Sequence, residues 1–215
     1  MSRREGGNPL PAVCASLSEG DHLWRKENPC TGRRECFSYT LVCTGPGYEA
    51  RSYAPSVWVG TRVQGEPYLR ALIKGFWRLF RYIQGRNTPE TYIPMTAPVL
   101  ARIGNNSESL EYTVYFLLPE AFQKEPPTPT EDSVFVEHFP ELQVYARVFG
   151  GWMTDENRQI QLQALDGKLS EDGRETEAGL HYTAGYNSPM ELFNRRNEVW
   201  RLVKGEIGCS PATPE

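Results

Sequence analysis

The sequence predicts an α+β fold in which a tandem βαββ repeat lays two helices against one strongly curved antiparallel sheet. The order strand, helix, strand, strand occurs twice along the chain. The segment 134–151 also resembles the segment 48–65 in its length, its central proline and its terminal glycine. A period of about 85 residues is too long for a solenoid unit, so the pattern indicates two copies of one folding unit.

The first repeat begins with extended segments. Residues 36–45 alternate apolar and polar side chains with a period of two, which is typical of a half-buried strand. Residues 48–65 give another extended segment, in which Pro55 marks an edge or a bulge. Residues 91–103 and 110–119 predict two more strands around a Gly-Asn-Asn turn.

The stretch 66–85 changes to a helical period. Its basic side chains fall mostly opposite its apolar ones, Pro67 suits the first turn, and Gly85 suits the end. An apolar stripe at this spacing usually faces a sheet. The stripe consists of Leu69, Leu72, Ile73, Phe76, Phe80 and Ile83.

The second repeat follows a proline-rich connector at 125–132. Thr154 suits the cap of a second helix, which ends near Gly173. We expect this helix, about 154–172, to lie on the same side of the sheet as the first. Its apolar positions are Ile160, Leu165 and Leu169, and the strands around it are 134–151, 180–192 and 197–203.

The composition excludes several classes of protein. The chain has 215 residues and a net charge of −4, so no global basic field favours nucleic acid as a partner. No apolar run approaches the roughly 18 residues of a transmembrane helix. Arginines near the N-terminus precede no apolar stretch, so we expect no export and predict a cytoplasmic location, with association with mitochondria as a further option.

The chain divides into three parts by composition. Residues 1–35 lack periodicity and predict a flexible arm, residues 36–207 form the domain, and residues 208–215 form a tail. The cysteines are odd in number and none lies in a CxxC pair, so we interpret them as reduced thiols of the cytosol. They are Cys14, Cys30, Cys36, Cys43 and Cys209.

Motifs for catalysis are sparse. The three histidines are His22, His138 and His181, and the sequence lacks a GxSxG elbow, an HExxH motif and a phosphate-binding loop. The double glycine at 150–151 lacks the context of a dinucleotide-binding loop. We therefore do not predict an enzyme.

The aromatic side chains have two interpretations. They line a flat apolar cleft with cations at its rim, or they form the core. Arg195 and Arg196 likewise bind an anion or lie in a solvated turn, where Glu198 could pair with one of them. The aromatic residues in question are Phe76, Trp77, Phe80, Tyr182, Tyr186, Phe193 and Trp200.

Between residues 46 and 204, several stretches resemble the SOUL/haem-binding-protein family in order and spacing, above all "MTAPV", "GYNSP" and "RRNEVW". The chain resembles the SOUL branch more than the shorter p22 branch. The resemblance implies a distorted antiparallel β-barrel flanked by two α-helices, and binding of haem or porphyrin by a soluble intracellular protein without enzymatic activity.

The resemblance also implies site residues. In the SOUL branch a histidine iron ligand is assigned to the position of Ser52, so coordination must come from elsewhere, with His138, His181 and Met190 as candidates. The p22 branch places porphyrin beside the first helix and the last hairpin, with basic groups at the propionates; Ile73 and Glu191 stand where two of these are expected. We expect apolar capture of haem, and of iron-free porphyrin. The implied pocket residues are Ile73, Phe76, Phe80, Met190, Arg195 and Arg196.

The resemblance also offers an alternative function. The SOUL branch is linked to Bcl-2-type partners and mitochondrial permeability through a BH3-like stretch, which corresponds here to residues 162–179. Leu165, Leu169 and Asp172 fit the pattern, whereas Glu175 and Thr176 replace apolar positions. The other interpretation is a helix that only covers the sheet. A small-molecule-sensing module is a third possibility, by analogy of fold alone.

Overall fold

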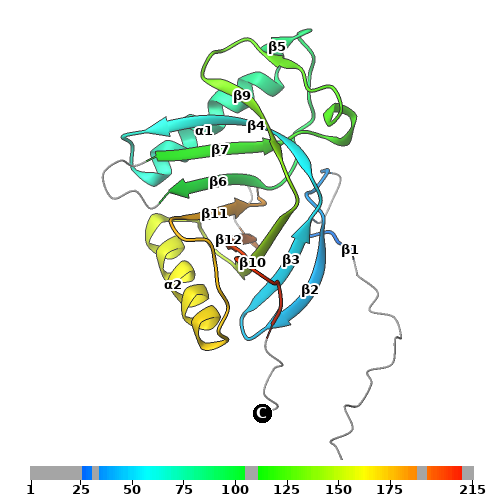
Figure 1. Ribbon diagram of the computed structural model, residues 1–215. Coiled ribbons are helices and arrows are strands. Elements are labelled where there is room, and N and C mark those ends of the chain that lie inside the picture. Colours follow the sequence, from blue (N-terminus) through cyan, green and yellow to red (C-terminus); the bar gives the residue numbers. More distant parts are fainter. Residues whose placement is uncertain (1–25, 31–33, 105–110, 188–192, 210–215) are drawn as a thin grey trace, which may run out of the picture.

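The computed structural model describes residues 26–30, 34–104, 111–187 and 193–209. In this part of the chain, two helices and a curled antiparallel sheet of ten strands form a half-barrel, which confirms the predicted fold class (Figure 1). The helices are α1 (Tyr68–Ile83) and α2 (Asp155–Glu171). The strands of the large sheet are β1 (Lys26–Glu27), β2 (Tyr39–Gly45), β3 (Tyr48–Tyr53), β4 (Ser56–Gln64), β6 (Val99–Gly104), β7 (Glu111–Leu117), β9 (Val134–Phe139), β10 (Leu142–Phe149), β11 (Leu180–Gly185) and β12 (Asn197–Leu202). A two-stranded sheet of β5 (Asn87–Thr88) and β8 (Thr128–Pro129) and a short 3₁₀ helix (Glu120–Phe122) complete the elements.

The sheet order shows the tandem repeat directly. The order is β1-β2-β3-β10-β12-β11-β6-β7-β4-β9. In each unit the strand before the helix pairs with the last strand, β4 with β7 and β10 with β12. The central pair β6 and β11 joins the two units, while β3 pairs with β10 and β9 pairs with β4. Strand β3, which precedes the first unit, therefore flanks the second unit, and strand β9, which precedes the second unit, flanks the first.

Two of the expected long strands are each divided by a proline. Pro55 lies between β3 and β4, and Pro140 lies between β9 and β10. Proline lacks the N–H that a sheet ladder needs, so pairing ends there. At both places the chain crosses from one unit to the other, and Pro55 therefore marks a boundary between strands.

Helix α1 packs closely on β4 and β7, with its smallest residues, Ala71 and Gly75, at the closest approach. Ala71, Gly75 and Leu79 face the sheet, and a Cβ atom added to Gly75 would lie 2.5 Å from Cγ2 of Val114. The expected apolar stripe is only partly buried. Ile83 is buried, and Leu72, Phe76 and Phe80 pack against the cluster under α1, whereas Ile73 is 58% exposed and Leu69 is also exposed. The expectation was wrong for Leu69 and Ile73, because the small residues beside them permit the close approach to the sheet.

Helix α2 begins and packs as its sequence predicts. The Thr154 hydroxyl accepts a hydrogen bond from the backbone N–H of Asn157 at 3.1 Å, which caps the helix. Leu165 and Leu169 are buried against β10 and β12, in a cluster that includes Tyr145. Figure 1 shows α1 and α2 over the two halves of the curled sheet.

The two faces of the sheet have different contents. On β4, Trp58 points to one face, while Val57 and Val59 point to the other face and join the cluster under α1. On β12, Trp200 and Val199 divide in the same way, with Val199 in the cluster under α2. Both helices therefore cover one face, the outer face, and an aromatic-rich cluster fills the opposite, inner face.

The cysteines contradict the interpretation as reduced thiols. Cys30 is bonded to Cys36, and Cys43 is bonded to Cys209. An odd number of cysteines does not exclude disulfide bonds, because it means only that at least one cysteine has no partner within the chain. The fifth cysteine, Cys14, lies outside the described residues. The fold brings Cys43 and Cys209 together across 166 positions of sequence, a proximity that sequence spacing does not reveal.

Both ends of the described chain contact the sheet. β1 pairs with β2, and the carbonyl of Glu35 accepts a hydrogen bond from the N–H of Ala97 at 3.0 Å. The boundaries of the arm at residue 35 and of the domain at residue 207 stay predictions. Neither helix in the described residues is long and apolar enough to cross a membrane.

Candidate functional site

A cleft of about 320 Å³ opens on the outer face between α1 and the segment that leads into α2. Its floor is formed by β6 and β11, the central pair of strands. Ala101 pairs with Thr183 and Val99 pairs with Gly185, and all four line the cleft. These side chains are small or absent, so the sheet leaves a hollow here.

One wall of the cleft is the side of α1 next to its sheet-facing side. Leu72 and Phe76 are half-buried in this wall, and Leu69, Ile73 and Trp77 are more exposed. The rings of Phe76 and Trp77 meet edge to face, with centroids 5.6 Å apart. This wall therefore offers a ligand a nearly continuous apolar surface.

The opposite wall comes from the residues before α2 and from the last hairpin. Trp152 and Met153 contribute the apolar part. The Arg195 guanidinium lies over the Trp152 ring, 4.2 Å from its centroid. Asn197 ties this wall down, because its side-chain amide donates to the carbonyl of Gly151 at 2.8 Å.

Arg195 is the one charged residue among the described residues that line the cleft. The Tyr68 hydroxyl at the floor is already hydrogen-bonded to Thr183 at 3.0 Å, and burial raises its pKa, so it stays protonated. The arrangement suits a flat apolar molecule that carries a negative group at one edge.

The structure separates the predicted pocket residues. Ile73, Phe76 and Arg195 line the cleft. Phe80 does not line it and instead stacks on Phe76, with ring centroids 5.8 Å apart. Arg196 points away from it. Met190 and Glu191 lie outside the described residues.

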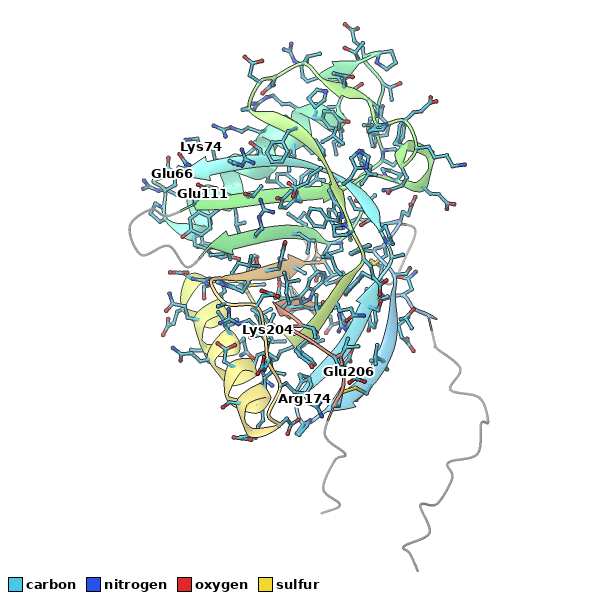
Figure 2. All side chains as sticks on the ribbon, in the orientation of Figure 1. Glu66, Lys74, Glu111, Arg174, Lys204 and Glu206 are labelled. Atoms are coloured by element: carbon cyan, nitrogen blue, oxygen red, sulfur yellow. A yellow bond between two sulfur atoms is a disulfide. The ribbon has the colours of Figure 1, made fainter. Side chains whose placement is uncertain are left out.

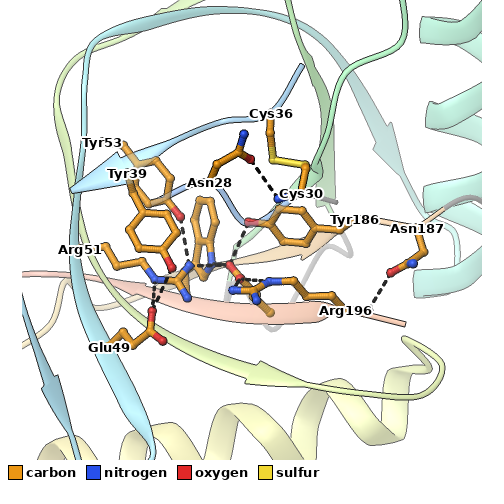
Figure 3. Close-up of polar contacts among 12 residues, drawn as sticks. Asn28, Cys30, Cys36, Tyr39, Glu49, Arg51, Tyr53, Tyr186, Asn187 and Arg196 are labelled. Carbon is orange, nitrogen blue, oxygen red and sulfur yellow. Dashed lines mark hydrogen bonds and ion pairs between the residues drawn. A yellow bond between two sulfur atoms is a disulfide. The ribbon is translucent and has the colours of Figure 1, made fainter. Parts of the chain in front are cut away.

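Arg196 binds a buried carboxylate on the inner face (Figure 3). Its Nε and Nη2 donate to Oε1 of Glu198 at 2.9 and 2.7 Å. The other carboxylate oxygen accepts from Arg51 at 2.8 Å, Trp200 at 2.7 Å and Tyr186 at 3.1 Å. Glu198 has no exposed surface, so this network is a structural element of the half-barrel.

Neither candidate histidine is placed to meet a ligand in the cleft. His138 is exposed on β9, where it pairs with Val57 of β4. His181 is buried on β11, with Nε2 2.7 Å from Nη1 of Arg158. Burial, together with Arg158 and Arg201, lowers the pKa of His181 to about 3, so its imidazole is neutral. The proposed ligand position of the SOUL branch, Ser52, lies on β3 and donates to Glu141 at 2.8 Å.

Several aromatic residues that were candidates for the cleft belong to the inner core. Tyr182, Tyr186 and Trp200 all pack in the cluster of the inner face. The sequence interpretation missed Trp152 and Met153, which follow the double glycine at 150–151. An aromatic residue just before a helix cap, with no strand pattern to bury it, was the available signal.

A larger hollow of about 1000 Å³ lies elsewhere, beside the Cys30–Cys36 disulfide, Tyr92, Tyr186 and Arg196. Its lining is more polar than that of the cleft. The cleft beside α1 is therefore the better match to a flat apolar ligand.

Comparison with known proteins agrees with this architecture. The C-terminal domain of EcmrR has a similar fold, with a TM-score of 0.58 over 73% of this chain and 96% of that domain, at 9% sequence identity. Heme-binding protein 2 of Homo sapiens is 43% identical over 75% of this chain and 80% of its own length. Heme-binding protein 1 of Mus musculus is 30% identical over 82% of this chain and 96% of its own length. The model of the SOUL heme-binding protein family matches residues 34–202, and the chain belongs to this family.

Proposed function

We propose that this chain binds haem in the cleft beside α1, mainly through burial of apolar surface. The observation that carries the proposal is an apolar cleft in which Arg195 is the single cation among the described lining residues. The relatives named as heme-binding proteins support the same ligand. They are not named as enzymes, and we propose a role as a carrier or buffer.

The residues of the cleft fit a porphyrin. A flat macrocycle placed between α1 and Trp152 buries apolar area on both of its faces, which gains roughly 25 cal/mol per Å² before the costs of association. The Arg195 guanidinium can pair with a propionate, because its planar fork matches a carboxylate. Leu72 and Phe76 hold the inner edge away from water.

We propose that iron coordination contributes little. No histidine or cysteine lies among the described residues of the cleft, and Met153 supplies its one thioether. Haem iron would add redox and ligand-binding chemistry when bound, but apolar capture does not depend on it. Iron-free protoporphyrin should therefore bind about as well as haemin.

Titration with haemin and with protoporphyrin IX tests both points. Gly185→Leu should block either ligand, because a Cβ atom at Gly185 meets nothing within 4 Å and the side chain would occupy the cleft. Gly104→Leu is the matched control, since Gly104 is equally open, lies on the neighbouring strand β6 and does not line the cleft. Equal loss in both variants, or no loss in Gly185→Leu, would contradict the proposed site.

The histidines provide a second test. His138→Ala and His181→Ala should leave the Soret band of bound haemin nearly in place, because neither side chain lines the cleft. Loss of haemin binding in one variant, with protoporphyrin binding retained, would identify that histidine as an iron ligand and overturn apolar capture.

The alternative function through Bcl-2-type partners gains no specific observation. Leu165 and Leu169 of α2 are buried between the helix and the sheet, and Asp172 accepts a hydrogen bond from Tyr48 at 2.6 Å. The stretch 162–179 could present these residues to a partner only if α2 left the sheet.

A cytoplasmic location, with or without association with mitochondria, also stays a proposal. Cytosolic thiols are kept reduced, whereas the structure pairs four cysteines. Disulfide mapping of the protein from its natural source tests the location, because intact Cys30–Cys36 and Cys43–Cys209 bonds would favour an oxidising compartment.

A further inference from the structure

The outer surface of α1 carries a row of exposed apolar side chains. Leu69, Ile73 and Trp77 follow one another at every fourth position and are 46%, 58% and 53% exposed. They form the lip of the cleft on the α1 side, and Trp152 on the opposite wall is 51% exposed. Exposed apolar residues gathered in this way mark a surface that contacts something other than water.

A row of cations runs beside these apolar residues. Arg70, Lys74 and Arg81 are exposed, and α1 contains four basic residues and no acidic residue. Lys74 pairs with Glu66 at 3.3 Å, which Figure 2 shows at the edge of the α1 half, and Arg81 pairs with Glu131 at 3.0 Å. Exposed pairs of this kind are weak and exchange readily with other anions. Arg70 has no ion-pair or hydrogen-bond partner among the described residues.

The other helix lacks both features. Helix α2 contains four acidic and two basic residues, and Ile160 is its one exposed large apolar side chain among the described residues. Asp155 and Glu156 lie at its N-terminus, on the side of the cleft opposite α1. The chain as a whole carries a charge of −4, so the positive charge of α1 is a local feature.

We propose that the outer surface of α1, defined by Leu69, Arg70, Ile73, Lys74 and Trp77, docks onto a bilayer that contains anionic lipids. Tryptophan and aliphatic side chains enter the interface, while arginine and lysine reach the phosphates beside them. An anionic headgroup layer complements the cations, and the acyl boundary covers the apolar row. Neither the cleft nor a porphyrin is needed for this contact.

The docked orientation would have a functional consequence. Leu69, Ile73 and Trp77 are both the docking surface and the lip of the cleft. The mouth would then open toward the apolar layer, where a hydrophobic macrocycle partitions. A ligand could pass between bilayer and cleft without crossing water. This second step rests on the proposed function, whereas the docking itself does not.

Vesicle binding of the ligand-free protein tests the proposal. We expect the protein to sediment with vesicles of phosphatidylcholine and phosphatidylserine, and much less with phosphatidylcholine alone or at high salt. In a Trp24→Phe background, which removes the tryptophan outside the described residues, emission from exposed Trp77 and Trp152 should shift to the blue, since Trp58 and Trp200 are already buried. Arg70→Glu with Lys74→Glu should lower the partition coefficient at least about tenfold, because each cation contributes roughly fivefold near an anionic surface.

Matched variants on α2 separate docking from general effects. Ile73→Ser should weaken binding, whereas Ile160→Ser, at 53% rather than 58% exposure, should not. Lys168→Glu on α2 is the control for the single charge reversal Lys74→Glu, because the two lysine side chains are similarly exposed. Equal effects on both helices would overturn insertion of this surface. Charge-dependent sedimentation without a change in tryptophan emission would also overturn it, and would favour an acidic protein as the partner of this surface. Failure here with haemin binding intact would remove only the docking proposal.

Discussion

Helices α1 and α2 occupy equivalent places in the repeat but direct different side chains toward the sheet and toward solvent. Both follow the outer strand of their unit and lie on the outer face of the sheet. Helix α2 directs its leucines inward and leaves a polar surface, whereas α1 approaches the sheet through Ala71 and Gly75 and turns large apolar residues toward the cleft and the solvent. The βαββ repeat thus determines where each helix lies, and the side chains of that helix determine whether the helix only covers the sheet or also forms a site.

The two helices are also attached by different interactions. Arg201 of β12 donates to both carboxylate oxygens of Asp166 at 2.7 Å, and Arg158 of α2 reaches His181 of β11. Charged side chains therefore tie α2 to strands β11 and β12. Helix α1 has polar contacts of its own, from Arg78 to the carbonyl of Arg62 at 2.9 Å and between Tyr68 and Thr183 at 3.0 Å. It differs in also requiring the absence of a side chain at Gly75, which lets the helix backbone approach Val114.

The largest contrast should appear when leucine and isoleucine side chains are removed. Leu165→Ala leaves a cavity under α2 and should cost about 2–5 kcal/mol of unfolding free energy. Ile73→Ala on α1 should cost less than about 0.5 kcal/mol, because the side chain is already half exposed. Urea unfolding measures both values. Similar losses would mean that α1 buries Ile73 in solution and would remove the contrast.

The mid-helix glycines should respond in opposite directions. Gly75→Ala forces α1 away from Val114 and should destabilise the protein by about 1–3 kcal/mol. Gly167→Ala on α2 meets nothing within 4 Å and should stabilise the protein by about 0.5–1 kcal/mol through helix propensity. Thermal unfolding of the two variants distinguishes them. Stabilisation by Gly75→Ala would show that α1 does not approach the sheet closely.

Acidification should act on the α2 side. The pKa of His181 is about 3 in the folded protein and lies near 6.5 when unfolded, so unfolding takes up a proton between these values. Stability is therefore highest above pH 6.5 and falls on acidification, by about 1 kcal/mol between pH 6 and pH 5 from this group. Arg158, Arg201 and the neighbouring Asp155 are the charged groups around it.

A His181→Asn variant checks the assignment. Its stability at pH 7 changes by an amount set by packing, but its slope between pH 6 and pH 5 should be smaller than that of the natural chain. An unchanged slope would mean that another group is responsible for the acid sensitivity.

Much of the fold follows from periodicity, while the site depends on contacts between distant residues. The two helices and the repeat are visible in the apolar pattern and the prolines. The sheet-facing side of α1 is not visible in this pattern. Hydrophobicity ranks Leu69 and Ile73 above Gly75, although only the glycine permits the contact with Val114. The Cys43–Cys209 bond joins two ends of the domain and has no local signal.

The different positions of Arg195 and Arg196 could have been predicted from the sequence, although our interpretation treated the two as a pair. Successive residues of an extended chain point to opposite faces. Since Trp200 is an inner-face residue, Glu198 and Arg196 share its face, and Arg195 and Asn197 share the other. Alternation alone therefore separates one arginine for the cleft from one for the buried carboxylate.

The same separation gives the smallest expected effect. Arg195→Ala should weaken porphyrin binding by about threefold to fivefold, because a single ion pair at an open cleft contributes little. Arg196→Ala should leave the affinity of the folded protein unchanged but lower its stability, since Oε1 of Glu198 loses both donors. Titration with protoporphyrin and urea unfolding, performed on both variants, measure the two quantities independently. Weaker binding in Arg196→Ala with Arg195→Ala unaffected would move the anionic edge of the ligand to the inner side, and the cleft beside α1 would lose its assigned cation.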